Sequence, residues 1–282
     1  MKQPSQQSED SQKIQQQISD NFGEAWTQYA EQKAVNPYTK EQFLDWISPL
    51  EAHDFTQKTV LEMGSGLGGF TEYAASFGAK MVVGLEISAA VDASASALLE
   101  KNPCLSFVQA DLLHPPFRTA QWDLVYSIGV LHHLEIPKNG FHQVAALARK
   151  EGGQVFIWVY GRENNELVVY IVDPLRKWMS KLPVAFVRWA VAFPLACILW
   201  PLLLLFYGPI SSKYLPYFDY FRWLRRYGFG YTHGMITDQL IPPRTHYLRQ
   251  DTLKDWFDSE GVIIDAITPR NKISWRVLGH KP

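Results

Sequence analysis

Between residues 59 and 160, short apolar runs rich in β-branched residues alternate with segments of helical length. The apolar runs are VLEM (60–63), MVVGLE (81–86), LSFVQA (105–110), LVYSIGV (124–130) and QVFIWVY (154–160). Between them lie helical stretches such as FTEYAASFG (70–78), AAVDASASALLEK (89–101) and GFHQVAALARK (140–150). This alternation is typical of parallel strands joined by crossover helices. Because such crossovers are right-handed, the pattern predicts an open, doubly wound α/β sheet with a ligand crevice at the carboxyl ends of its strands.

The remaining sequence predicts elements on both sides of this core. Near the C-terminus, VIIDAIT (262–268) and ISWRVLGH (273–280) predict two more strands, preceded by a helix over 253–260. Asp251 or Thr252 is the expected N-cap of that helix, and Gly261 its end. Residues 1–20 are polar and Gln-rich, without the apolar stretch of a secretory signal, and predict a disordered tail. The expected divisions are this tail, N-terminal covering helices at 21–58, a core at 59–160 and 245–282, and an insertion at 161–244.

A glycine-rich segment joins the first predicted strand to its helix. It reads Glu62-Met63-Gly64-Ser65-Gly66-Leu67-Gly68-Gly69. Glycines at such a turn let the backbone approach a ligand that a side chain would exclude. Glu86 ends the second strand, where a carboxylate can accept hydrogen bonds from ribose hydroxyls, and Asp111 follows the third strand. Glycines also mark ordinary turns, and acidic residues also cap helices, but here three strand ends indicate the same ligand crevice.

With these residues the sequence resembles the class I S-adenosylmethionine-dependent methyltransferases, and within them it looks like the ubiquinone and menaquinone biosynthesis type. The resemblance covers residues 59–160 and returns over 253–281. In the family the first motif reads acidic-x-Gly-x-Gly-x-Gly, which Glu62, Gly64, Gly66 and Gly68 match. The resemblance implies a Rossmann-like seven-stranded sheet, mostly parallel with an antiparallel last strand, and S-adenosylmethionine as the cofactor.

The resemblance also implies which residues surround the cofactor. The glycine-rich loop holds the methionine part, Glu86 the ribose and Asp111 the adenine edge, while the fourth-strand segment YSIGVLHHL (126–134) borders the methionine moiety. The implied cofactor-binding residues are Glu62, Gly64, Ser65, Gly66, Gly68, Glu86, Ile87, Asp111, Leu112, Ser127 and Ile128. No metal site is expected.

Two other functions remain open. Gly64, Gly66 and Gly69 also satisfy the dinucleotide pattern GxGxxG, so an NAD(P)-dependent oxidoreductase is an alternative. Against it, Glu62 stands where that pattern usually continues an apolar strand, and Asp111 has no necessary role in binding nicotinamide. A non-catalytic, membrane-associated protein that retains the fold is the other alternative, because a fold alone does not establish catalysis.

Candidate catalytic and substrate residues lie at the ends of the later strands. Methyl transfer from a sulfonium depends mainly on in-line positioning, and a base matters only if the acceptor must lose a proton. His132 and His133 are the candidate bases, because imidazole titrates near neutral pH. Candidate substrate contacts are Tyr29, Tyr160, His246 and Tyr247. Oxygen, carbon and nitrogen acceptors all remain open.

The insertion at 161–244 is too long and too apolar for an ordinary connection. No charged residue lies between Trp189 and Ser212, and about 20 apolar residues suffice to span a bilayer. A single crossing conflicts with strands that must pair across it, and prolines break the run. Basic residues border the run on both sides: Arg176, Lys177, Lys181, Arg188, Lys213, Arg222, Arg225 and Arg226. Two interpretations therefore stand: an element that docks on an anionic membrane, or an apolar lid on the core.

Composition limits the expected partners and cellular compartment of the protein. With 27 Lys and Arg against 28 Asp and Glu, the chain gives no reason to expect nucleic acid as a partner. Cys104 and Cys197 are the only cysteines, which is compatible with a reducing compartment. We therefore expect a cytoplasmic methyltransferase, peripheral or monotopic at a membrane if the insertion docks there. Its expected substrate is small and lipophilic, and its oligomeric state is open.

Overall fold

A single seven-stranded sheet forms the centre of the protein in the computed structural model, which describes residues 13, 16–24, 38–208 and 213–282. The strands are β1 (Thr59–Met63), β2 (Met81–Glu86), β3 (Leu105–Gln109), β4 (Leu124–Ile128), β5 (Gln154–Tyr160), β6 (Ile263–Arg270) and β7 (Ser274–His280). Their order is β3-β2-β1-β4-β5-β7-β6, and β7 runs antiparallel to both of its neighbours. The predicted Rossmann-like sheet with its antiparallel last strand is confirmed.

Helices cover both faces of this sheet. Those of the core are α2 (Lys40–Ile47), α3 (Gly69–Ser76), α4 (Ala90–Leu98), α5 (Pro137–Leu147) and α11 (Gln250–Ser259), with short turns η1 (Ala52–Phe55), η2 (Leu99–Lys101) and η3 (Leu131–His133). Alternate strand residues point to opposite faces, so Val60 packs with Phe43 of α2, whereas Leu61 packs with Phe141 of α5. Each face therefore has its own apolar core.

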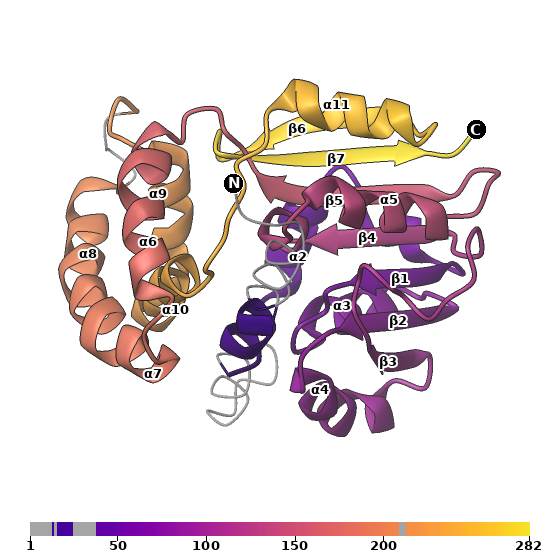
Figure 1. Cartoon of the computed structure of the whole chain (residues 1–282), viewed down its shortest axis with the longest axis horizontal. Coiled ribbons are helices and arrows are strands. Elements are labelled where there is room, and N and C mark those ends of the chain that lie inside the picture. Colours follow the sequence, from indigo (N-terminus) through magenta and orange to yellow (C-terminus); the bar gives the residue numbers. More distant parts are fainter. Residues whose placement is uncertain (1–12, 14–15, 25–37, 209–212) are drawn as a thin grey trace, which may run out of the picture.

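The insertion forms a helical bundle beside the carboxyl ends of the parallel strands (Figure 1). It contains η4 (Val168–Val172), α6 (Asp173–Met179), α7 (Val184–Phe186), η5 (Val187–Ala192), α8 (Phe193–Phe206), α9 (Phe218–Leu224), η6 (Arg225–Tyr227) and α10 (Gly228–Leu240). Helix α10 lies between the sheet and the outer helix α8 in this view, and it packs against both α6 and α8. The bundle thus stands where a substrate would approach the strand ends.

Elements α7, η5 and α8 form one continuous helical stretch, Val184–Phe206. It has 23 residues, and its most apolar window of 18 residues has a mean hydropathy of 2.2, which by length and composition would allow it to cross a membrane. Only 17% of its most apolar window is buried within the protein. Large side chains such as Trp189, Ile198 and Leu205 are more than half exposed. The stretch is therefore an apolar helix with most of its surface uncovered.

A chain of partly buried hydrogen bonds joins the bundle to the end of β5. Tyr160 accepts a hydrogen bond from Gln239 Nε2 on α10 at 2.6 Å. Arg176 of α6, which is 1% exposed, donates to the Gln239 carbonyl oxygen at 2.5 Å and to its Oε1 at 3.0 Å. Because Arg176 is almost fully buried, losing Gln239 would leave a buried guanidinium group without these acceptors. The contacts fix α10 against the strand end.

Two local features differ from the sequence-based expectations. Residues 16–24 are helical, so the expected disordered tail does not extend to residue 20. Ile18 and Phe22 form the apolar side of this helix. The side chain of Asn21 donates a hydrogen bond to the Ile241 carbonyl. Neither Asp251 nor Thr252 is the N-cap of α11. The helix begins earlier, at Gln250, whose backbone N–H donates to the Glu163 carboxylate from another segment. Gly261 does end the helix, with φ of +61°.

Candidate active site

The loop between β1 and α3 turns through three glycines in the left-handed region. Their φ values are +90° at Gly64, +53° at Gly66 and +74° at Gly68. A β-carbon at Gly64 would collide with Val130, and one at Gly68 would meet the ring of Phe107. Backbone N–H groups of Gly64 and Ser65 donate to the Leu85 carbonyl, which holds the loop against β2. Only glycine adopts this backbone conformation at little cost in free energy, and in this conformation the loop lines a pocket.

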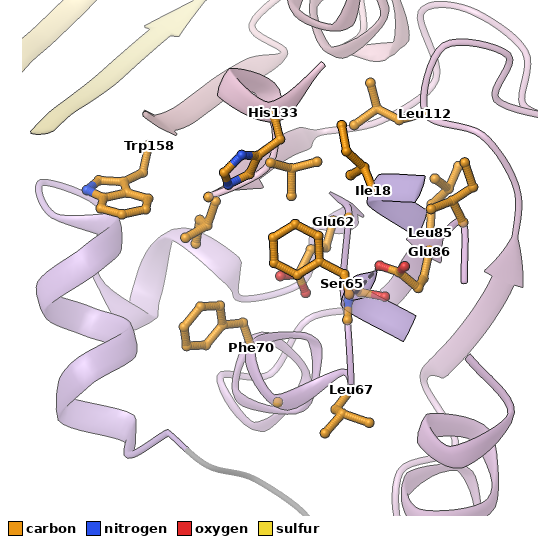
Figure 2. Close-up of a pocket in the computed structure, with 18 of the residues that line it drawn as sticks. Ile18, Glu62, Ser65, Leu67, Phe70, Leu85, Glu86, Leu112, His133 and Trp158 are labelled. Atoms are coloured by element: carbon orange, nitrogen blue, oxygen red, sulfur yellow. Dashed lines mark hydrogen bonds between the residues drawn. The ribbon is translucent and has the colours of Figure 1, made fainter. Parts of the chain in front are cut away.

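Glu62, the residue before the last of β1, places a buried carboxyl group on one wall of that pocket (Figure 2). Its Oε2 accepts hydrogen bonds from Thr71 at 2.6 Å and from Tyr126 at 3.0 Å. Burial raises the pKa of Glu62 to about 8, although both hydrogen bonds favour the ionised form. No cationic side chain among the described residues pairs with it, so the ligand-free pocket keeps this carboxyl group mostly neutral at pH 7.

Glu86 and Ser65 complete the polar side of the pocket. Glu86 accepts hydrogen bonds from the backbone N–H groups of Gly66 at 2.9 Å and Ser88 at 3.0 Å. One carboxylate therefore ties the glycine-rich loop to the end of β2. The buried Ser65 hydroxyl has no hydrogen-bond partner among the described residues. A buried polar group in this state usually indicates an interaction that the protein alone does not provide.

Most of the expected cofactor residues line one cavity. They are Glu62, Gly64, Ser65, Gly66, Glu86, Ile87, Asp111, Leu112 and Ile128. Asp111 uses one carboxylate oxygen to accept from the backbone of Leu113 and the other to contact His114. Two expected residues lie outside the lining: Gly68 is the N-cap of α3, and the Ser127 hydroxyl donates to the Met63 carbonyl at 2.8 Å.

The two candidate bases have different surroundings. His133 lines the pocket, and its Nδ1 lies 3.0 Å from the Arg244 carbonyl, which requires the proton on that nitrogen. Burial lowers the pKa of His133 to about 3. His132 does not line the pocket; its ring stacks on Tyr160 and neither ring nitrogen has a partner among the described residues. Burial also lowers the pKa of His132 strongly. Both rings are therefore poor proton acceptors at neutral pH.

A second, apolar cavity of about 420 Å³ adjoins the first. Trp46, Trp158, Tyr160 and Met235 line both cavities. The second, here called the apolar chamber, is lined mainly by aliphatic and aromatic side chains of the insertion, including Val172, Leu195 and Tyr220. Its polar lining residues are Asn165, Gln239, Arg270, Asn271 and Ser274. Of the expected substrate residues, Tyr160 and Tyr247 line the chamber, His246 lines neither cavity, and Tyr29 lies outside the described residues.

Sequence reasoning missed several residues that line the first cavity. Ile18 and Phe22 come from the helix at residues 16–24, Trp46 from α2, and Trp158 from β5. Asp238 comes from α10 in the insertion. Asp238 is the only acidic residue in the helix GFGYTHGMITDQL, and this is the one feature of the sequence that could have indicated a functional role for it.

The residues around the first cavity fit a nucleoside ligand with a cationic portion. The glycine turn leaves room for close approach, Glu62 and Glu86 present carboxyl groups, and Ser65 has an unused hydroxyl. Residues 61–157 match a protein family described as a methyltransferase domain, and this segment carries every expected cofactor residue. The chain contains a methyltransferase domain. The predictions of a methyltransferase and of S-adenosylmethionine as its cofactor are confirmed at the level of this domain.

Solved structures show the same fold at low sequence identity. One is a chain of the complex between the Haloferax volcanii Trm112 methyltransferase activator and a candidate methyltransferase; it has 13% identity and a TM-score of 0.56, with 94% of this chain and 97% of that one covered. An O-methyltransferase family protein from Burkholderia thailandensis has 11% identity and a TM-score of 0.53, with 86% and 55% covered. A candidate S-adenosylmethionine-dependent methyltransferase from Listeria monocytogenes has 17% identity and a TM-score of 0.51, with 86% and 97% covered. No curated protein matches the chain.

The raised pKa of Glu62 leads to a prediction about stability. A carboxyl group that titrates near 8 when folded and near 4.5 when unfolded stabilises the fold fully below pH 4.5, and this contribution is lost as pH rises toward 8. At about 1.4 kcal/mol per pKa unit, the loss is on the order of a few kcal/mol. Glu62→Gln keeps an oxygen for Thr71 and Tyr126, so urea unfolding of this variant between pH 5 and 8.5 should show a smaller decrease than wild type. Glu151→Gln, at an exposed turn, is the control; equal decreases in all three proteins would contradict the assignment.

Proposed function

We propose that the protein transfers a methyl group from S-adenosylmethionine in the first cavity to a lipophilic acceptor in the apolar chamber. The observation that carries this proposal is the adjacency of the two cavities through Trp46, Trp158 and Tyr160. Bound S-adenosylmethionine supplies a methyl group on a positively charged sulfur. Because little covalent help is needed from the protein, positioning of donor and acceptor supplies much of the rate.

The proposed cofactor contacts follow from the residues that face the cavity. Glu62 would attract the cationic methionine portion, Glu86 would accept hydrogen bonds from ribose hydroxyls, and Asp111 with Leu112 would border the adenine. Glu86 already accepts two backbone hydrogen bonds, and a carboxylate retains further acceptor capacity after them. Ser127 would act indirectly, because its hydroxyl donates a hydrogen bond to the Met63 carbonyl at the end of β1 and does not line the cavity.

The chamber favours an acceptor with an apolar body. Its walls carry few polar side chains, and burying apolar surface there gains roughly 25 cal/mol per Å². Such an acceptor agrees with the quinone-biosynthesis type that the sequence resembles. An NAD(P)-dependent oxidoreductase would have no evident use for a carboxyl group at Glu62, two residues before the first glycine of the loop.

Ligand binding separates these functions. S-adenosylmethionine should bind with measurable heat, because Glu62 and Glu86 can receive its charge and hydroxyl groups, and NADH should give none. Titration calorimetry with both ligands at pH 7.5 provides the comparison. Micromolar binding of NADH together with no heat from S-adenosylmethionine would overturn the proposed function.

The glycine loop offers a sharper test by mutation. Gly66→Val places a β-branched side chain at φ of +53° beside the cavity, so S-adenosylmethionine binding should decrease at least about 100-fold. Gly152→Val is a matched control, because Gly152 also has a positive φ, +69°, but lies away from both cavities. The control should bind as wild type does. Wild-type affinity in a folded Gly66→Val protein would remove this loop from the cofactor site.

We also propose that the insertion docks on the cytoplasmic surface of an anionic membrane rather than acting as an internal lid. A lid would bury Val184–Phe206 against the core, but the outer helix α8 exposes Ile198, Leu202 and Leu205. Leu195 of the same helix also lines the chamber, so an acceptor dissolved in the bilayer would lie next to its binding site. Contiguous exposed apolar surface of this kind is typical of an interaction site.

Fewer basic residues of the insertion are exposed to lipid headgroups than the sequence indicates. Arg176 and Arg188 are 1% and 5% exposed, so they serve the interior and cannot contact lipid headgroups. Exposed basic residues in the described part of the insertion include Lys181, Lys213, Arg222 and Arg226. Each such residue near an anionic surface contributes about 1 kcal/mol, and salt screens this contribution.

Vesicle binding should therefore have two separable components. Replacing Lys181, Arg222 and Arg226 with Gln should decrease sedimentation with phosphatidylserine vesicles chiefly at low salt. Replacing Ile198 and Leu205 with Asp should decrease it at every salt concentration, because both side chains are exposed and their apolar contribution is not screened.

Glu151→Gln serves as a control variant outside the insertion, and S-adenosylmethionine binding reports whether each variant is folded. If the wild-type protein stayed in the supernatant at all salt concentrations, membrane docking would be wrong and a partner other than lipid would have to cover α8.

A further inference from the structure

Asp238 faces the first cavity from the insertion, at its junction with the apolar chamber. Met235, Asp238 and Gln239 are spaced so that they lie on one side of α10. Met235 lines both cavities, Asp238 lines the first and Gln239 lines the second. The hydrogen bond from Gln239 to Tyr160 fixes this side of the helix toward the end of β5. The carboxyl group is therefore held where the two cavities meet.

This carboxyl group has no structural task in the described part of the protein. It is partly buried, and no described residue forms a hydrogen bond or ion pair with it. Its charge interacts with that of Arg188 of η5 and helps to raise the pKa values of Tyr160 of β5, Tyr220 of α9 and Tyr231 of α10. Burial raises the pKa of Asp238 to about 7, with Arg188 acting in the opposite direction. A general base works best with a pKa near the working pH.

Other polar groups at the cavity are less suited to accept a proton. His133 has its Nδ1 proton directed to the Arg244 carbonyl, and burial disfavours a second proton on the ring. Glu62 is occupied by Thr71 and Tyr126. Glu86 holds the backbone of Gly66 and Ser88. Only Asp238 among these groups has both carboxylate oxygens uncommitted.

We propose that Asp238 is a catalytic residue that accepts the proton of a hydroxyl or amine on the lipophilic methyl acceptor. The inference rests on the proposed function and adds the class of acceptor. As the acceptor oxygen or nitrogen gains the methyl group, the carbon–sulfur bond of the donor breaks and its electron pair stays on sulfur. The O–H or N–H bond breaks in the same process, its proton passes to a carboxylate oxygen of Asp238, and water later removes it.

Deuterium labelling in cells can identify the acceptor, because the transferred methyl group carries the label into the product. Cells that produce the wild-type protein, Asp238→Asn or Asp219→Asn are grown on methionine with a deuterated methyl group, and their lipid extracts are compared by mass spectrometry. Asp219 is a matched control, because it lies on α9 outside both cavities and pairs with Lys272. Wild type and Asp219→Asn should label the same lipid on oxygen or nitrogen, and Asp238→Asn should not.

The labelled lipid then serves as the substrate for purified proteins. Asp238→Asn should lower kcat by about 100-fold or more, as expected for loss of a general base, while calorimetry shows S-adenosylmethionine binding within about twofold of wild type. The wild-type kcat/KM, which reports the ligand-free protein, should rise with pH through about 7, and the variant should lack this rise. Asp238→Glu, which keeps the carboxyl group, should retain a measurable rate and a displaced pH profile.

The outcomes separate this inference from the proposed function. Labelled lipid with an unchanged rate in Asp238→Asn, or a new methyl group on carbon, would overturn the role of Asp238 and leave methyl transfer to a lipid standing. Absence of any labelled lipid in cells that produce the wild-type protein would overturn the proposed function, and the inference with it.

Discussion

The pairing of β7 with β5 constrains the rest of the molecule. The two strands are matched along seven residues, from Gln154 opposite His280 to Tyr160 opposite Ser274. The insertion leaves the sheet directly after β5, and the chain must return to place β7 beside that same strand. Both ends of the insertion therefore lie at one edge of the sheet. A single passage through a bilayer is incompatible with this pairing, whereas an apolar helix lying along a membrane surface is not.

The same constraint brings the two cavities together. Parallel strands β1, β2 and β4 direct the glycine-rich loop and the acidic residues to their carboxyl ends, as the rule for open α/β sheets requires. The returning insertion closes over those ends, with Gln239 hydrogen-bonded to Tyr160 and Arg176 bonded to Gln239. Trp158 and Tyr160 thus lie between a first cavity, built mainly at the strand ends of the core, and an apolar chamber built mainly by the insertion.

This division explains what the sequence could predict. The strands and the glycine turn follow from local periodicity and backbone geometry, so the sheet, the crevice at its strand ends and the side chains of Glu62 and Glu86 could be anticipated. Contacts between distant segments leave no periodic signal. The cap of α11 by Glu163, the pocket contacts of Ile18 and the place of Asp238 all depend on packing between segments that are far apart in the sequence. Histidines next to a strand end looked suitable as bases, but their burial depends on the same distant segments.

The first cavity is lined by two carboxyl groups with raised pKa values. Glu62 belongs to the core and Asp238 to the insertion. Neither is neutralised by a lysine or arginine in direct contact among the described residues. Keeping both groups ionised would cost folding free energy, so their partial protonation stabilises the ligand-free fold. A positively charged donor would reverse this balance by favouring the ionised forms. The ionisation of both carboxyl groups thus depends on the bound ligand. Once Asp238 has lost its proton in this way, its carboxylate can take up a proton from the methyl acceptor.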